Sequence, residues 1–278
     1  MLGALIVVFR EVIEAGLIVG IALAVTRGVR GSRRWIAGGV LAGAVGALLV
    51  AGFAEQLSAA MAGRGQEMFN AGVLGLAVAM LAWHNIWMAR HGRELAHELS
   101  DVGRAVASGD KTFMALGVVV AVAVLREGAE VALFLYGILI SGESGLDVII
   151  GGFAGLGLGA LVSFLTFFGL VTIPPRRLFA VTSVLVTLLA GGLAAQCAAF
   201  LQQGGVVAAL SQTLWDTSAI LPDNSLFGRV LHTLVGYSDQ PSALQGVAYL
   251  GTILVIVIAT RFAAPASPRL APINAPAE

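Results

Sequence analysis

The chain has 278 residues, of which 58% are hydrophobic and 12% are charged, and its 16 basic side chains balance its 16 acidic ones. Soluble globular proteins carry about 25% charged residues, so the composition excludes that class and predicts a membrane protein. The zero net charge gives no indication of a nucleic-acid partner. Since Cys197 is the only cysteine, the chain has no internal disulfide, and we interpret Cys197 as a small buried hydrophobic side chain.

Seven segments are long and apolar enough to cross a bilayer as helices, which takes about 20 mainly apolar residues. The first has no basic start and carries charges at its centre, so we expect a retained helix rather than a cleaved signal. The sequence thus predicts an all-α, polytopic membrane protein with seven transmembrane helices. The segments are residues 2–26, 35–54, 68–89, 113–140, 147–171, 178–201 and 242–260.

The first segment contains three charged residues in the stretch "VVFREVIEAGLIVG", residues 7–20. At about 100° and 1.5 Å per residue, Arg10, Glu11 and Glu14 share one face of a helix. Arg10 and Glu14 have the i, i+4 spacing at which opposite charges meet. An intramembrane charge costs at least about 2.5 kcal/mol, and such residues commonly mark ion pathways. We therefore expect the triplet to have a function beyond packing.

The same triplet recurs in the fourth segment, in "VAVLREGAEVALFLYG" at residues 122–137. Arg126, Glu127 and Glu130 follow the first triplet at a constant offset of 116 residues. A weaker echo relates residues 36–49 to 149–162. A unit of three helices reverses the chain direction, so we predict a 3+3 inverted repeat, an architecture of many secondary transporters, plus one C-terminal helix.

Basic residues alternate between the two sides of the predicted membrane. Successive connections, including the C-terminal tail, contain 4, 1, 4, 0, 2, 1 and 2 arginines or lysines. Basic residues concentrate on the cytoplasmic side. We therefore predict that the N-terminus faces out and the C-terminus faces in.

These assignments divide the chain into six parts. The polar linker between the two repeats has helical spacing, and the long outer loop contains helix-breaking prolines. The parts are the first three-helix repeat at 1–89, the cytoplasmic linker at 90–112, the second three-helix repeat at 113–203, the outer loop at 204–241, the seventh helix at 242–262 and the cytoplasmic tail at 263–278.

Two counter-running helices would bring four carboxylates and two guanidiniums to one site at mid-membrane. About two negative charges would remain, which favours a bound cation over purely structural pairing between the helices. Carboxylate oxygens suit hard metal ions, and no cluster of Cys or Met indicates copper(I). The predicted metal ligands are Glu11, Glu14, Glu127 and Glu130, with Arg10 and Arg126 in support.

The two R-E-x-x-E motifs, "REVIE" in the first helix and "REGAE" in the fourth, resemble those of the oxidase-dependent iron transporter family. This family includes the fungal high-affinity iron permeases and the bacterial ferrous-iron uptake permeases. The resemblance covers residues 1–262 and implies a multi-pass permease of the cytoplasmic (inner) membrane whose glutamates bind iron. Iron is then the transported substrate, and we expect neither an enzyme nor a bound organic cofactor.

The resemblance also implies partners besides the iron ion and membrane lipid. The fungal permeases work with a multicopper ferroxidase, and the bacterial systems use periplasmic proteins, so periplasmic iron-binding or ferroxidase partners are expected. The outer connection "SGESGLD" is shorter than the acidic loops of fungal members. Its Glu143 and Asp147 form a candidate entrance for the ion.

Other polar residues are secondary candidates. His84 lies near the inner end of the third segment and is a candidate exit ligand, although Trp83 and Trp87 beside it also fit an aromatic belt at the membrane interface. We interpret Gln196 as a hydrogen-bonding link between helices. Solvation explains the remaining candidates better than metal binding does, and they are Glu55, Glu67, His91, Glu94, His97, Glu98, Asp101, Asp216, Asp223 and His232.

Three other functions remain as alternatives to iron import. Since oxygen ligands do not identify their metal, the first is transport of another divalent ion such as manganese or lead. The second is a membrane-embedded iron oxidoreductase, for which the sequence offers no histidine-rich or cofactor motif. The third is a membrane scaffold that transports nothing.

Overall fold

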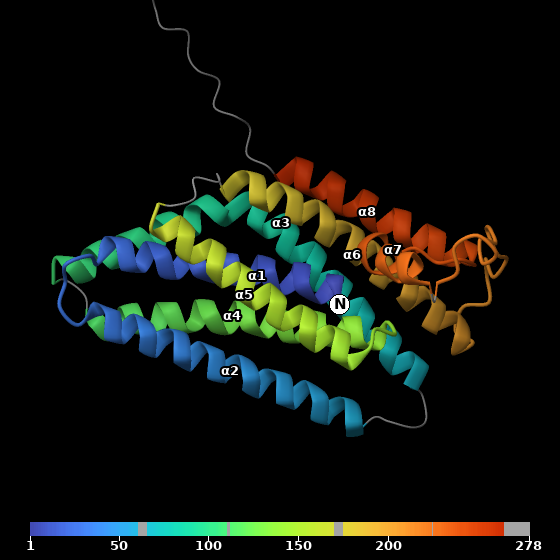
Figure 1. Cartoon of the computed structure of the whole chain (residues 1–278), viewed down its shortest axis with the longest axis horizontal. Helices are drawn as coiled ribbons and strands as arrows, with labels where there is room; N and C mark the ends of the chain where they lie inside the picture. Colours follow the sequence, from blue (N-terminus) through green and yellow to red (C-terminus); the bar gives the residue numbers. More distant parts are fainter. Residues whose placement is uncertain (61–65, 110–111, 170–174, 224, 264–278) are drawn as a thin grey trace, which may run out of the picture.

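The computed structural model describes residues 1–60, 66–109, 112–169, 175–223 and 225–263. These residues form eight helices and no strand, which confirms the predicted all-α class (Figure 1). The helices are α1 Leu2–Val25, α2 Ser32–Ala60, α3 Gln66–Ala107, α4 Phe113–Ile140, α5 Gly145–Phe167, α6 Pro175–Gln203, α7 Leu226–Val235 and α8 Ala243–Ala263.

Five of the described helices contain a stretch long and apolar enough to cross a membrane. Large apolar side chains on their outer faces, such as Leu48 on α2, Phe153 on α5 and Leu250 on α8, are exposed, as expected for contact with lipid. The chain is therefore a multi-pass membrane protein. The stretches are Ser32–Phe53, Gln66–Met88, Gly145–Phe167, Ala180–Gln203 and Ala243–Ala263.

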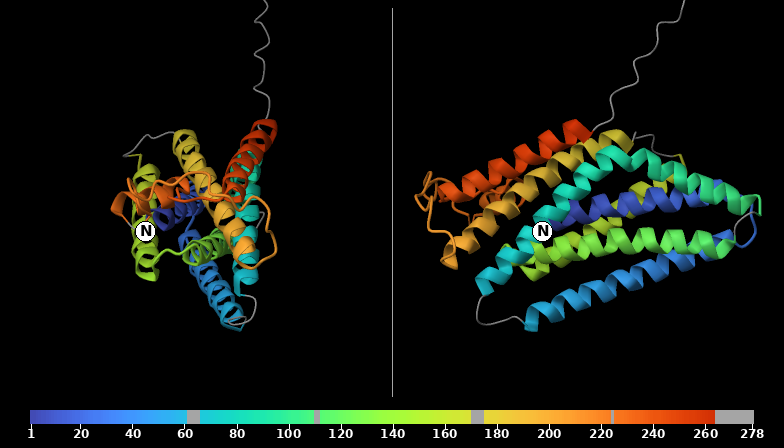
Figure 2. Two further views of the ribbon diagram at one scale, coloured as in Figure 1. Left: turned by 90° about the vertical axis from the view of Figure 1, so that its right-hand side faces the viewer. Right: turned by 180° about the vertical axis from the view of Figure 1, so that it is seen from behind.

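The two remaining long helices carry the charged triplets and lie inside an elongated bundle (Figure 1 and Figure 2). α1 has 24 residues and α4 has 28, and both are continuous through their triplets. α1 packs mainly against α5, and α4 packs mainly against α2. α3 packs against α6 and also contacts both α1 and α4, so it closes the space beside the two charged helices.

α3 does not end where its apolar segment ends. It continues beyond residue 89 through most of the predicted linker, as far as Ala107, and it bends along its length (Figure 2). The helical spacing of the polar residues in this stretch agrees with that continuation.

The predicted outer loop, 204–241, contains a short helix, α7, that the sequence pattern does not predict. α7 has ten residues and begins where the Ser225 hydroxyl accepts a hydrogen bond from the Gly228 amide at 2.9 Å. It ends at Gly236, whose φ of +66° favours glycine. At about 15 Å, α7 is too short to cross a membrane.

Glycines bring the backbones of paired helices close together. A Cβ on Gly155 of α5 would lie 2.5 Å from the Leu5 carbonyl oxygen of α1. A Cβ on Gly43 of α2 would lie 2.6 Å from the Ala121 carbonyl oxygen of α4. Small residues at such contacts are typical of membrane helices that associate by close packing.

The contact between α1 and α5 can be tested with two neighbouring glycines. Gly155→Ala places a methyl group against backbone atoms of α1, so we expect a loss of about 1–3 kcal/mol of stability. Gly157→Ala is the matched control, because nothing lies within 4 Å of its Cβ position. Thermal unfolding of the purified variants in detergent measures the difference. Equal melting temperatures would contradict the close contact.

Candidate metal centre

The α1 triplet is buried almost completely. The side chains of Arg10 and Glu14 are each 3% exposed, and Glu11 is 1% exposed. Arg10 Nε lies 2.9 Å from Glu14 Oε1, so the predicted i, i+4 ion pair is present. Glu11 is buried beside this pair, and the hydrogen bond of Arg10 goes to Glu14 instead of to Glu11.

The α4 triplet repeats this arrangement with one difference. Arg126 Nε lies 3.1 Å from Glu130 Oε1, and Glu127 is buried. The Arg126 side chain is 35% exposed, whereas Arg10 is buried. The guanidinium of Arg126 lies 4.3 Å from the centre of the Trp87 ring on α3, which gives it a cation–π contact in addition to its carboxylate.

His84 of α3 joins the two triplets. Its Nε2 atom lies 3.2 Å from Glu14 Oε2 and 3.8 Å from Glu11 Oε2, and its Nδ1 atom contacts Glu130 Oε2. The ring is 2% exposed. Its place near the inner end of the third segment predicts a candidate exit ligand, but His84 instead lies between the carboxylates of both helices. The signal in the sequence was an ionisable residue inside a predicted span.

Four side chains converge on one point and are nearly close enough to bind one metal ion together. One ligand atom each from Glu11, His84, Glu127 and Glu130 lies within 4.8 Å of the others. Ligand atoms that bind one ion at about 2.1 Å lie at most about 4.2 Å apart, so a small inward movement would complete a site. Glu14 lies beside this group and is held by Arg10 and His84.

The buried carboxylates lack enough donors. Both oxygens of Glu11 and Oε2 of Glu127 have no hydrogen-bond partner among the residues that the structure describes. When all four carboxylates are ionised, the two guanidiniums and a cationic His84 leave one negative charge unbalanced, and a neutral His84 leaves two. An uncompensated buried charge is costly. A bound cation would satisfy both the free oxygens and the charge.

A hydrogen-bonded clamp next to His84 holds α3 against α6. Asn85 Nδ2 donates to Thr187 Oγ1 at 2.9 Å, and the Ser183 hydroxyl donates to Asn85 Oδ1. The clamp fixes the part of α3 that carries His84. Further along α6, Gln196 donates to the Ser141 carbonyl oxygen at 3.2 Å, which agrees with its interpretation as a link between helices.

The candidate entrance residues lie apart from the cluster. Glu143 pairs with the amino group of Met1 at 2.7 Å, and it lines a small cavity of about 20 Å³ together with His232. The His232 ring contacts the Tyr237 carbonyl oxygen at 2.7 Å. Asp147 lies in the first turn of α5. None of these side chains belongs to the four converging groups.

Three further acidic candidates are exposed at the surface of the protein. Glu67 is exposed at the start of α3, and Asp101 pairs on the surface with Arg104 at 3.0 Å. Hydrogen bonds from Ser218 lower the pKa of the exposed Asp216.

Asp223 and Cys197 also have local partners. Partial burial and the nearby Asp239 carboxylate raise the pKa of Asp223. Cys197 is partly buried, and its thiol donates to the Ala71 carbonyl oxygen at 3.2 Å. The remaining sequence candidates have side chains outside the described part of the structure, and they are Glu55, His91, Glu94, His97 and Glu98.

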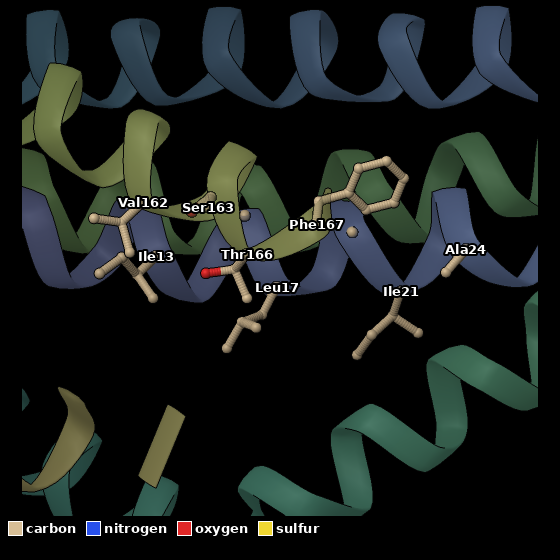
Figure 3. Close-up of a pocket in the computed structure, with 10 residues that line it drawn as sticks. Ile13, Leu17, Ile21, Ala24, Val162, Ser163, Thr166 and Phe167 are labelled. Carbon is tan, nitrogen blue, oxygen red and sulfur yellow. The ribbon is translucent and has the colours of Figure 1, made fainter. Parts of the chain in front are cut away.

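A larger cavity of about 270 Å³ lies between α1 and α5, beside the half of α1 that follows the charged triplet (Figure 3). Ile13, Leu17 and Ile21 of α1 and Phe167 of α5 contribute apolar walls. Its lining contains no carboxylate or imidazole. The converging groups that could hold a metal ion therefore lie outside this cavity.

Comparison with known proteins gives one family. The sequence model of the Iron permease FTR1 family matches residues 1–266. The Ferrous iron permease EfeU of Escherichia coli O6:H1 (strain CFT073) is 30% identical over 259 residues, which cover 91% of this chain and 93% of that protein. The Ferrous iron permease EfeU of Shigella flexneri is 28% identical over 195 residues, which cover 70% and 83%. No solved structure matches the chain.

The unequal burial of the two arginines leads to a prediction. Arg10→Met leaves Glu14 buried without its guanidinium, and breaking a buried pair costs about 3–5 kcal/mol. Arg126→Met costs less, because the Arg126 and Glu130 side chains are 35% and 12% exposed, whereas those of Arg10 and Glu14 are each 3% exposed. Thermal unfolding of both variants in detergent compares them. An equal or larger loss for Arg126→Met would contradict the asymmetry.

Proposed function

The chain belongs to the Iron permease FTR1 family, and we propose that it imports iron ions across the cytoplasmic membrane through the glutamate cluster between α1 and α4. Its relatives are named permeases, which agrees with a transporter rather than an enzyme. The observation that carries the proposal is the cluster of buried carboxylates, with too few cations, at the centre of two long helices.

In this proposal the ion binds among the four glutamates, with Glu11, Glu127 and Glu130 as ligands and Glu14 next to them, and the two arginines stabilise the empty site. Without iron, Arg10 pairs with Glu14 and Arg126 pairs with Glu130, which limits the cost of burying the carboxylates. Iron would compete with the guanidiniums for these oxygens. The arginines would then find new partners, and this exchange would couple occupancy of the site to movement of the helices.

We further propose that seven helices span the membrane, with α1 and α4 added to the five apolar ones. The N-terminus then faces out and the C-terminus in. α1 runs inward, so Arg10 lies on the outer side of the cluster. α4 runs outward, so Arg126 lies on the inner side. Periplasmic partner proteins, which the family resemblance implies, would deliver iron to the outer face.

The helix contacts support the proposed inverted repeat. A Cβ on Gly43 and a Cβ on Gly155 would contact positions that are 116 residues apart, the same offset that relates the two triplets. Gly43 therefore corresponds to Gly155 at an offset of 112 residues. The weaker sequence echo, residues 36–49 against 149–162, has an offset of 113 residues, which differs by one. The contacted positions are Leu5, Val8 and Phe9 on α1, and Ala121, Val124 and Leu125 on α4.

The role of the glutamates is tested by removing their charge while keeping their shape. We expect Glu11→Gln, Glu14→Gln, Glu127→Gln and Glu130→Gln each to reduce iron uptake into proteoliposomes at least about tenfold, because each removes a charged ligand or its partner. Asp101→Asn is the control, since Asp101 is exposed and outside the cluster. If all four variants retained uptake, the cluster would not be the transport site.

The orientation is tested by labelling single cysteines in intact cells. Because Cys197 is the only native cysteine, Cys197→Ala provides a cysteine-free background. Ser211→Cys in the outer loop should react with a membrane-impermeant thiol reagent, and Ser108→Cys after α3 should react only once the cells are opened. Both positions are exposed. The opposite pattern would contradict the proposed orientation.

A further inference from the structure

We propose that His84 is the nitrogen ligand that makes the cluster prefer Fe²⁺ over the harder ions Mn²⁺, Mg²⁺ and Ca²⁺. The inference rests on the proposed function, because it takes the glutamate cluster as the site that binds the transported ion. It adds a specificity-determining residue that neither R-E-x-x-E motif contains.

The position of His84 fits a ligand better than a packing residue. Its ring is 2% exposed, and its nitrogens lie within 4.0 Å of three carboxylates, those of Glu11, Glu14 and Glu130. It contacts Glu14 of α1 and Glu130 of α4, so it touches both halves of the cluster. It also belongs to the four groups whose ligand atoms converge within 4.8 Å.

The imidazole breaks the symmetry of an otherwise repeated site. α1 and α4 each contribute one arginine and two glutamates, whereas α3 contributes a histidine and α6 contains none. The clamp from Asn85 to Thr187 and Ser183 holds this part of α3 in place. The fold therefore supplies one fixed nitrogen donor to a set of oxygen donors.

A nitrogen donor changes which ions the cluster prefers. Carboxylates alone suit magnesium, calcium and manganese, whereas imidazole suits iron, zinc, copper and nickel. Magnesium in particular gives up its water reluctantly and favours oxygen ligands. Replacing one oxygen with an imidazole nitrogen therefore raises the affinity for Fe²⁺ relative to these harder ions.

The test compares metal binding by the purified full-length protein in lipid nanodiscs, without oxygen. Fe²⁺, Mn²⁺ and Mg²⁺ are titrated separately into the unmodified chain, His84→Gln and Glu11→Gln. His84→Gln substitutes an amide for the imidazole, so we expect Fe²⁺ affinity to fall about tenfold or more while Mn²⁺ and Mg²⁺ affinities change less than about threefold. His232→Gln is the control, because His232 lies outside the converging groups.

The outcomes separate this inference from the proposed function. If Glu11→Gln binds Fe²⁺ as tightly as the unmodified chain, the glutamate site itself is wrong. If Glu11→Gln loses binding but His84→Gln either binds Fe²⁺ as tightly as the unmodified chain or loses affinity for all three ions equally, only the role of His84 is wrong.

A second measurement needs no variant and so does not depend on whether His84→Gln folds. X-ray absorption at the iron edge of the Fe²⁺-loaded protein should show the scattering of a coordinated imidazole ring. A spectrum with oxygen ligands alone would overturn the inference.

Discussion

The structure depends on the cost of burying charge in the interior of a membrane protein. Four carboxylates, two guanidiniums and one imidazole lie together at the centre of α1, α3 and α4. The guanidiniums neutralise half of the carboxylates, and the free oxygens of Glu11 show where compensation is missing. A site that is nearly but not fully neutral can accept a cation and later release it. This balance suits the proposed transport of a cation, since full neutralisation would remove the attraction for the ion and no neutralisation would prevent folding.

The packing of the helices follows from the need to bring α1 and α4 together. Glycines let α5 press against one side of α1 and α2 against one side of α4, with backbone atoms close enough to exclude a methyl group. The charged faces of α1 and α4 are then left to face each other and α3. α3 closes the cluster with His84 and covers Arg126 with Trp87. The same close contacts at equivalent positions explain why the two triplets are presented in the same way.

Much of this arrangement could be predicted from the sequence, because it depends on local spacing. The i, i+4 distance between Arg10 and Glu14 predicts their ion pair, and the offset of 116 residues predicts that α4 presents the same groups. The role of His84 could not be predicted in this way. Its position in the cluster depends on how α3 crosses α1 and α4, and spacing along one helix carries no information about that crossing. α7 was missed for a different reason, since a ten-residue helix is too short to give the long apolar signal of a membrane span.

The central claim is that iron binds between the two triplets, and the most direct test is to locate the bound ion. Crystals of the iron-loaded protein, measured on both sides of the iron absorption edge, give an anomalous difference map that identifies iron by element. The account predicts one peak enclosed by Glu11, Glu127, Glu130 and His84, at about 2.0–2.2 Å from their ligand atoms. An iron peak elsewhere in the chain, with this cluster empty, would contradict it.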